Sequence, residues 1–237
     1  MEMMNRHARA KVQIVSRSGE PFLNRWQAGQ LLARELNYLK GKRAVVLGIP
    51  RGGIVVAQVL AQEIEADLDI VLSRKLGTPG QTELAMGALA EDGGVYLNRL
   101  VIDELGIPLT SIEQEKELEM AEIKRRSRLI REVLPRTSLK DRTVVVTDDG
   151  VATGATMQVA IWAIRRENPW NLTVAIPVAS DEAVEKMAQD ADEIICLRLP
   201  TYFMAVGQFY RQFEQVSDEE VLEILRKEKE RRRQKNG

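Results

Sequence analysis

The chain has 237 residues, of which 44% are hydrophobic and 29% charged, and its formal net charge is −1. This composition is typical of a globular protein with a sizeable core, and the near-zero charge argues against a nucleic-acid partner. No uncharged run has the length and apolarity of a membrane span, and the first residues carry no apolar signal region. The single cysteine, Cys196, cannot form an intrachain disulfide, so we expect a reducing, cytoplasmic compartment. The only histidine, His7, has no cysteine cluster near it, which argues against a zinc site.

Predicted helices and strands alternate along most of the chain. Asn24 is the expected N-cap of a first helix, with Trp26 and Leu32 among the residues on its inner faces. Strands are expected at about 43–50, 67–74, 142–148, 171–178 and 193–199, with an extended stretch at about 86–97. This alternation predicts an α/β fold, a doubly wound and mostly parallel sheet, in a single domain covering 1–237.

A short glycine-containing loop follows the first of these strands. Arg51, Gly52 and Gly53 stand between the apolar run 43–50 and a helix. Two glycines let the backbone approach an anion closely, and Arg51 adds a permanent positive charge. The tripeptide alone also fits a helix entry made flexible by glycine.

The next strand runs into a turn-rich loop that carries Lys75 and Glu83. Both residues are candidates for chemistry, and both also fit solvated loop charges. Further along, a helical insertion is expected at about 99–137, with a capping box at Thr110 to Glu113 and a long helix to about Val133. Acidic residues fill the first half of that helix and basic residues the second, which complements a helix dipole. A lid, a dimer arm and simple packing all remain possible roles for the insertion.

The most informative stretch is 144–157, in which a buried strand, two carboxylates and a Gly/Thr loop follow one another. The carboxyl end of such a strand is where open α/β sheets bind ligands. Asp148 and Asp149 offer adjacent acceptor oxygens suited to the two neighbouring hydroxyls of a ribose. The loop that follows opens a helix and favours a phosphate, through Ala152, Thr153, Gly154, Ala155 and Thr156. Paired acids after a strand also occur where they bind a metal or cap a helix, as in receiver-like and phosphatase-like sites.

Residue by residue, 144–157 resembles the phosphoribosyl-pyrophosphate (PRPP) signature of type I phosphoribosyltransferases. In that family the paired acids hold the ribose hydroxyls, and the A-T-G-x-T loop wraps the 5′-phosphate. The resemblance therefore implies that Asp148 and Asp149 form a ribose clamp and that 152–156 bind the 5′-phosphate. Arg51-Gly52-Gly53 resembles the family's pyrophosphate loop, which carries a non-proline cis peptide.

The resemblance extends over nearly the full chain, to bacterial phosphoribosyltransferases of undefined substrate. The R-K-x-G start at 74–77 resembles adenine-type enzymes, which implies that Lys75 neutralises pyrophosphate and that Glu83 exchanges a proton with the base. In the C-terminal hood and tail, about 199–237, Phe203 matches the aromatic residue that stacks on the base. Ala152 stands where 6-oxopurine enzymes carry an acid in the phosphate loop, and Arg198 is no clear match for the lysine that reads their 6-oxo group. The identity of the acceptor base therefore stays open, with a purine favoured.

The implied protein is a transferase that moves 5-phosphoribose from PRPP to a nitrogenous base. It would depend on Mg²⁺ held by substrate oxygens and water, with no dedicated protein metal site. A homodimer is expected. The alternative is a non-catalytic PRPP-sensing regulator, because the same fold serves in regulatory proteins and a fold does not fix function. The basic run 226–235 is interpreted as a solvated helix end in preference to a nucleic-acid arm.

Overall fold

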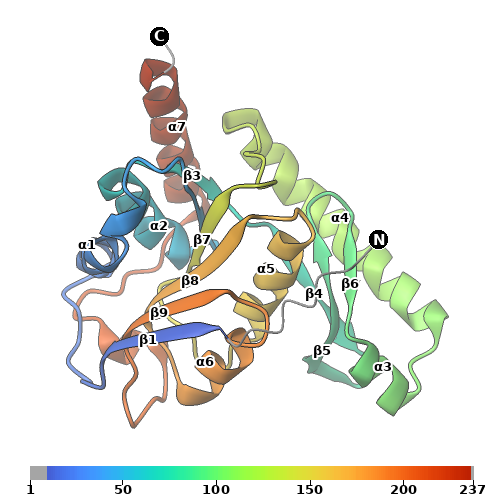
Figure 1. Cartoon of the computed structure of the whole chain (residues 1–237). Helices are drawn as coiled ribbons and strands as arrows, with labels where there is room; N and C mark the ends of the chain where they lie inside the picture. The colour runs from blue at the N-terminus through green and yellow to red at the C-terminus, as the bar shows by residue number, and fades with distance from the viewer. Residues whose placement is uncertain (1–9, 236–237) are drawn as a thin grey trace.

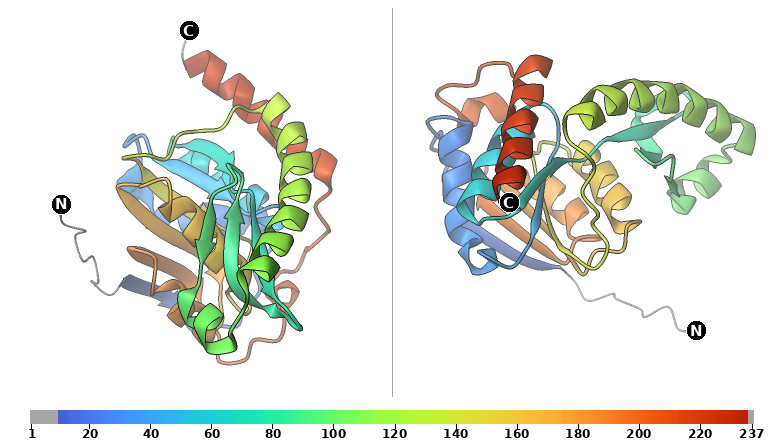
Figure 2. Two further views of the ribbon diagram at one scale, coloured as in Figure 1. Left: turned by 90° about the vertical axis from the view of Figure 1, so that its right-hand side faces the viewer. Right: turned by 90° about the horizontal axis from the view of Figure 1, so that it is seen from above.

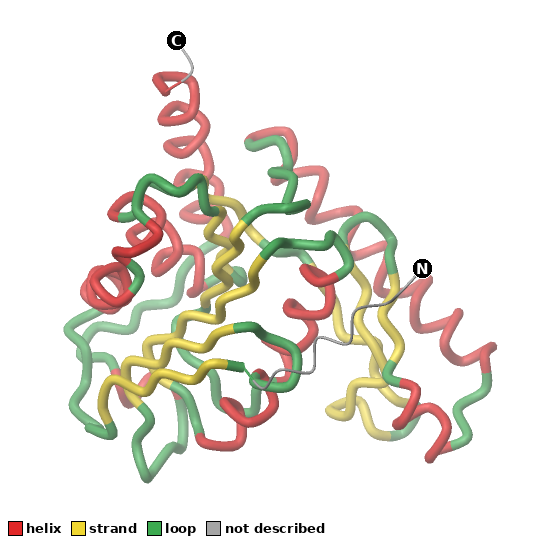
Figure 3. Tube along the Cα trace, viewed as in Figure 1, coloured by secondary structure: helices red, strands yellow, loops and turns green. Residues whose placement is uncertain are grey.

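The computed structural model describes residues 10–235, except the side chains of 81–83. Its main sheet has six parallel strands in the order β1-β9-β8-β7-β2-β3 (Figures 1 and 3). The predicted fold class is confirmed. In chain order these strands are β1 (Lys11–Ser16), β2 (Val45–Gly48), β3 (Asp67–Ile70), β7 (Thr143–Thr147), β8 (Asn171–Val178) and β9 (Glu193–Arg198).

Helices cover both faces of this sheet and produce two separate apolar cores. One core joins the sheet to α1 (Arg25–Glu35), α2 (Gly52–Glu63) and α7 (Asp218–Lys235). The other joins it to α5 (Ala155–Arg165) and α6 (Asp181–Met187). Successive strand residues point alternately into the two cores, so the central strands are apolar on both faces. In the sequence these strands are therefore continuous hydrophobic runs.

A second, antiparallel sheet stands beside the first, in the order β4-β5-β6 (Figure 2). It consists of β4 (Ser73–Thr78), β5 (Gln81–Ala90) and β6 (Val95–Leu97), and it shares a small core with α3 (Arg99–Leu105) and α4 (Leu109–Val133). The long helix of the insertion is therefore present and packs on this sheet. Its expected capping box is wrong, because the N-cap is Pro108 with no side-chain cap and Thr110 already lies in the first turn.

One strand was not predicted, and one predicted strand is shorter than expected. The sequence does not indicate β1 because Val12 and Val15 are 41% and 46% exposed, so the segment has no continuous apolar run. The expected strand 67–74 ends at Ile70, and the chain enters the second sheet at Ser73. Asn24 does cap α1, accepting a hydrogen bond from the Gln27 N–H at 3.0 Å.

The first helix, α1, and the last helix, α7, also differ from what the sequence predicts. Trp26 is 52% exposed and does not lie on the inner face of α1. The basic tail is a solvated helix end only in part. Arg226, Lys227, Arg233 and Lys235 are exposed, whereas Arg231 and Arg232 donate to backbone carbonyls at and just before β3. Glu228 is 4% exposed and accepts a hydrogen bond from the Leu68 N–H at 3.1 Å. Two short 3-10 helices complete the fold, η1 (Asn37–Leu39) and η2 (Val206–Phe209).

Candidate functional site

The two principal motifs meet at the carboxyl edge of the main sheet. Strands β2 and β7 are hydrogen-bonded neighbours, with Gly48 paired to Thr147 at their ends. The Ile49 N–H donates to the Thr147 carbonyl at 3.0 Å, so the loops that follow the two strands start side by side. Parallel packing thus joins motifs that lie about a hundred residues apart in the sequence.

The glycines at 52 and 53 lie directly against the acid pair. A Cβ at Gly52 would lie 1.9 Å from Asp149 Oδ2, and one at Gly53 would lie 2.8 Å from Asp148 Oδ1. A side chain at either position would displace an acid, so glycine is required here for close approach. The peptide bond between Pro50 and Arg51 is cis, as the resemblance implies.

Asp148 occupies a position that disfavours its charge. Its Oδ1 accepts a hydrogen bond from the Asp149 N–H at 2.8 Å. Burial, followed by the negative charge of Asp149, raises the pKa of Asp148 well above its usual value, although backbone N–H groups and Arg25 act against that rise. Asp148 therefore favours its neutral form more than an exposed aspartate does.

Asp149 is held by Arg25, a residue that the sequence did not single out. Arg25 Nε donates to Asp149 Oδ2 at 2.8 Å, and both side chains are largely buried, at 11% and 14% exposure. Arg25 Nη1 donates to the Glu214 carbonyl at 2.8 Å, and its guanidinium lies 4.0 Å from the centroid of the Phe213 ring. As the first residue of a helix, Arg25 looks like an ordinary surface cation, so no sequence signal marks it.

The predicted phosphate loop begins α5. Gly154 is the N-cap residue, with the left-handed φ of 78° that favours glycine. The carbonyls of Ala152 and Thr153 accept hydrogen bonds from the Ser180 hydroxyl and Lys186 Nζ, which fixes the loop against α6. Ala152, Thr153 and Thr156 are exposed. The start of a helix presents unpaired N–H groups and a partial positive charge, so this loop can bind an anion.

The hood segment packs back onto the same edge. The Tyr210 hydroxyl donates to the Asp149 carbonyl at 2.6 Å, and burial raises the pKa of Tyr210 well above its usual value, so the hydroxyl stays a donor. Phe203 is partly buried, with its ring 5.1 Å from that of Phe209. The guanidinium of Arg198 lies 3.7 Å from the centroid of the Phe22 ring, and its buried Nη1 has no hydrogen-bond partner among residues 10–235.

The two predicted catalytic residues lie in the second sheet. Lys75 is in β4, paired with Ala88, and is partly buried. Glu83 is in β5, and its side chain lies outside the described residues. The segment between them is a β-hairpin that turns at Pro79 and Gly80, not the expected irregular loop. The assignments to Lys75 and Glu83 remain predictions.

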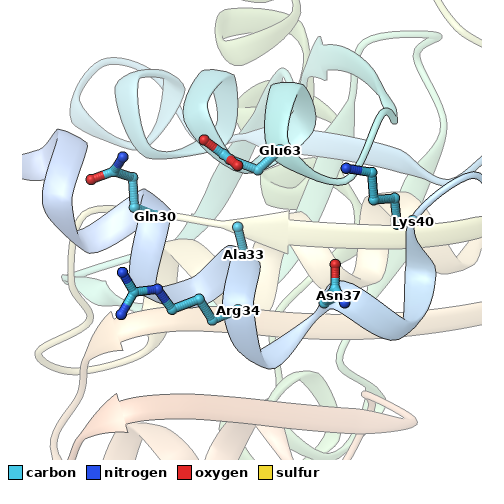
Figure 4. Close-up of a pocket in the computed structure, with 6 residues that line it drawn as sticks. All are labelled: Gln30, Ala33, Arg34, Asn37, Lys40 and Glu63. Atoms are coloured by element: carbon cyan, nitrogen blue, oxygen red, sulfur yellow. The ribbon is translucent and has the colours of Figure 1, made fainter.

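Two of the surface cavities differ in their relation to the predicted site. A small one of about 60 Å³ is lined by Pro50 and Arg51 together with residues of α4 and α7. A larger one of about 410 Å³ lies between α1 and α2 and contains none of the predicted site residues (Figure 4). No helix in the described range 10–235 is long and apolar enough to cross a membrane.

Comparisons with known proteins agree with this fold and give the family of the chain. The phosphoribosyl transferase domain family matches residues 26–93 and 90–214, and the chain belongs to that family. Two proteins of Mycobacterium tuberculosis, from strains CDC 1551 and H37Rv, are 41% identical over 86% of this chain and 46% of their own length. Their names assign them provisionally to the phosphoribosyl transferases, and this chain spans about half their length.

Among solved structures, the protein TT1426 from Thermus thermophilus is similar throughout. It is 41% identical, with a TM-score of 0.83, and the match covers 87% of this chain and 98% of TT1426. The family match and the two mycobacterial relatives confirm the predicted resemblance to the phosphoribosyltransferases.

Proposed function

We propose that this protein transfers 5-phosphoribose from PRPP to a nitrogenous base and releases pyrophosphate. One observation carries the proposal. Gly52 and Gly53 pack directly against Asp148 and Asp149, beside the start of α5. An anion-binding loop, a pair of acids and a helix start therefore share one edge of the sheet, in the arrangement that a phosphorylated ribose with a pyrophosphate group requires.

Each part of PRPP has a counterpart at this edge. The 5′-phosphate would lie on the N–H groups of 152–156, and the ribose hydroxyls would donate to Asp148 and Asp149. The pyrophosphate would lie on the backbone of Gly52 and Gly53, beside the charge of Arg51. In the reaction, a nitrogen of the base bonds to C1′ of the ribose while the C1′–O bond to pyrophosphate breaks. Lys75 would oppose the charge on the departing pyrophosphate, and Glu83 would take up the proton of the base.

The magnesium ion of this proposal would be held mainly by PRPP oxygens and by water. Mg²⁺ keeps several of its waters and usually binds through substrate phosphates and one or two carboxylates. Asp148 and Asp149 are assigned to the ribose hydroxyls, so the ion would be held through PRPP and its own waters. Bound Mg²⁺ would neutralise the negative charge that develops on the leaving pyrophosphate.

The acceptor would lie beneath the hood. Phe203 could stack on a flat heterocycle, a contact of roughly 1–3 kcal/mol per base. We favour a purine-type acceptor and a role in nucleotide metabolism. A cytoplasmic homodimer belongs to the same proposal.

The direct test is pyrophosphate release from PRPP and Mg²⁺ in the presence of a panel of purines, pyrimidines and simple amines. Calorimetry with PRPP on the parent and on Asp148→Asn/Asp149→Asn separates binding from turnover. Each lost hydrogen bond to a charged group should weaken binding by roughly 1.5–3 kcal/mol. The matched control is Asp103→Asn, an exposed acid in α3. Unchanged PRPP affinity in the double variant would refute the ribose clamp. PRPP binding without turnover for any acceptor would favour the sensor alternative.

A further inference from the structure

The ribose acid Asp149 and the hood are joined through a single side chain. The Arg25 guanidinium donates from Nε to Asp149 Oδ2 and from Nη1 to the Glu214 carbonyl, each at 2.8 Å. Its face lies on the ring of Phe213, which itself stacks on Tyr210 with centroids 5.0 Å apart. Three different segments, the start of α1, the loop after β7 and residues 210–214, therefore meet at one buried cation.

The hydrogen bond from Arg25 occupies only one of the two carboxylate oxygens of Asp149. Only Oδ2 is used by Arg25, and Oδ1 accepts no hydrogen bond from the described part of the chain, which is residues 10–235 without the side chains of 81–83. Oδ2 also faces Gly52, where a Cβ would lie 1.9 Å away. The carboxylate is thus fixed between the glycine and the guanidinium, with its second oxygen left for a ligand hydroxyl.

The hood touches Asp149 at a second point, because the Tyr210 hydroxyl donates to the Asp149 carbonyl at 2.6 Å. Backbone hydrogen bonds also join the hood to the residues before α1, from Phe22 N–H to the Phe209 carbonyl and from Arg211 N–H to the Phe22 carbonyl, each at 2.8 Å. The position of residues 209–214 and the orientation of the Asp149 carboxylate are therefore set by the same contacts.

Resting on the proposed function, we infer that Arg25 is a positioning residue that couples the hood to the ribose clamp. Arg25 holds Asp149 in the orientation that accepts a ribose hydroxyl, and it holds the hood over the edge where that ribose would lie. Coupling of this kind is reciprocal, so a ligand that engages Asp149 also orders the hood, and an acceptor that engages the hood favours the competent acid.

A ligand-free experiment tests the coupling without reference to PRPP. Hydrogen–deuterium exchange of residues 206–216 is compared in the parent, Arg25→Gln, Asp149→Asn and the double variant. We expect both single variants to accelerate exchange in this segment, and the double variant to add nothing beyond Arg25→Gln. Unchanged exchange in Asp149→Asn, or fully additive effects, would overturn the inference. The control is Arg34→Gln, an exposed arginine on the same helix that lines the cavity in Figure 4.

A binding experiment then tests the role in the clamp. Loss of the charge-assisted contact should raise the PRPP dissociation constant of Arg25→Gln by roughly 10- to 100-fold, while Arg25→Lys should recover part of the loss. Arg34→Gln should match the parent. If the parent binds PRPP and Arg25→Gln binds it equally well, the inference is wrong. If the parent does not bind PRPP, the proposed function is wrong, and the exchange experiment still decides the coupling.

Discussion

Replacing Arg131 with methionine should strongly destabilise the protein, because this arginine fastens the insertion to the main sheet. Arg131 Nη1 donates to Asp69 Oδ1 at 2.7 Å, and Nε and Nη2 bind both oxygens of Glu91 at 2.7 Å. The three side chains are 16%, 2% and 9% exposed. The substitution preserves the apolar stem but leaves two buried carboxylates without their main counter-charge.

Removal of one partner from a buried ion pair costs about 3–5 kcal/mol. The lower end applies here, because Asp69 would keep the Thr137 N–H at 2.8 Å and Glu91 would keep the Ser127 hydroxyl at 2.5 Å. We therefore expect a loss of about 3 kcal/mol in the free energy of unfolding, or roughly 6–12 °C in Tm for a chain of this size.

Urea unfolding followed by circular dichroism measures the loss, with Arg128→Met as the control because Arg128 is an exposed residue of the same helix. Burial acts to raise the pKa of Glu91, but hydrogen bonds from Arg131 and Ser127 outweigh it, so the pKa lies below its usual value. A carboxyl of this kind stabilises the fold above its unfolded pKa of about 4.3 and loses that effect as the pH falls. The difference between the parent and Arg131→Met should therefore shrink below about pH 4. A loss under 1 kcal/mol at pH 7 would refute the reasoning.

Three further predictions concern the site and the core. The raised pKa of Asp148 lowers the stability of the fold as the pH rises above the unfolded pKa of about 3.9. Asp148→Asn removes this carboxyl, so the variant should be more stable at pH 7 by roughly 0.5–2 kcal/mol. The same variant should lose PRPP affinity. Urea unfolding that shows no gain would contradict this. Lys75→Ala and Glu83→Gln should lower turnover by about 10²–10⁴-fold and PRPP affinity far less, as initial rates and calorimetry would show; variants with full turnover would place the chemistry elsewhere. Burial raises the pKa of Cys196 to about 12, so the native thiol should not react with Ellman's reagent until the protein is unfolded. Rapid labelling of the native protein would be inconsistent with its buried position.

The sheet could be predicted from the sequence where strands are covered on both faces. Val144, Val145 and Val146 are fully buried in alternation between two cores, and a continuous apolar run is the direct result. The same signal is missing in β1, an edge strand with two exposed valines. Periodicity also cannot show that the chain leaves one sheet at Ile70 and enters another at Ser73.

The candidate site also has parts that the sequence predicts and parts that it does not. The acid pair and the glycine loop were predictable because both follow buried parallel strands, whose carboxyl ends share one edge. Arg25 was not predictable, because its partners Asp149 and Glu214 are 124 and 189 residues away in the sequence. The packing of the tail was not predicted for a related reason. Several of the groups that its side chains bind are backbone groups, which the pattern of charged residues cannot indicate.

The contacts of α7 with β3 also protect this edge of the main sheet from strand addition by another chain. As the last strand of the main sheet, β3 would present unpaired N–H and carbonyl groups on which another chain could add a strand. Glu228 accepts from the Leu68 N–H, while Arg232 donates to the Leu68 carbonyl and Arg231 to the Ala66 carbonyl. Three side chains of one helix thus take the place of a neighbouring strand and close this edge to aggregation.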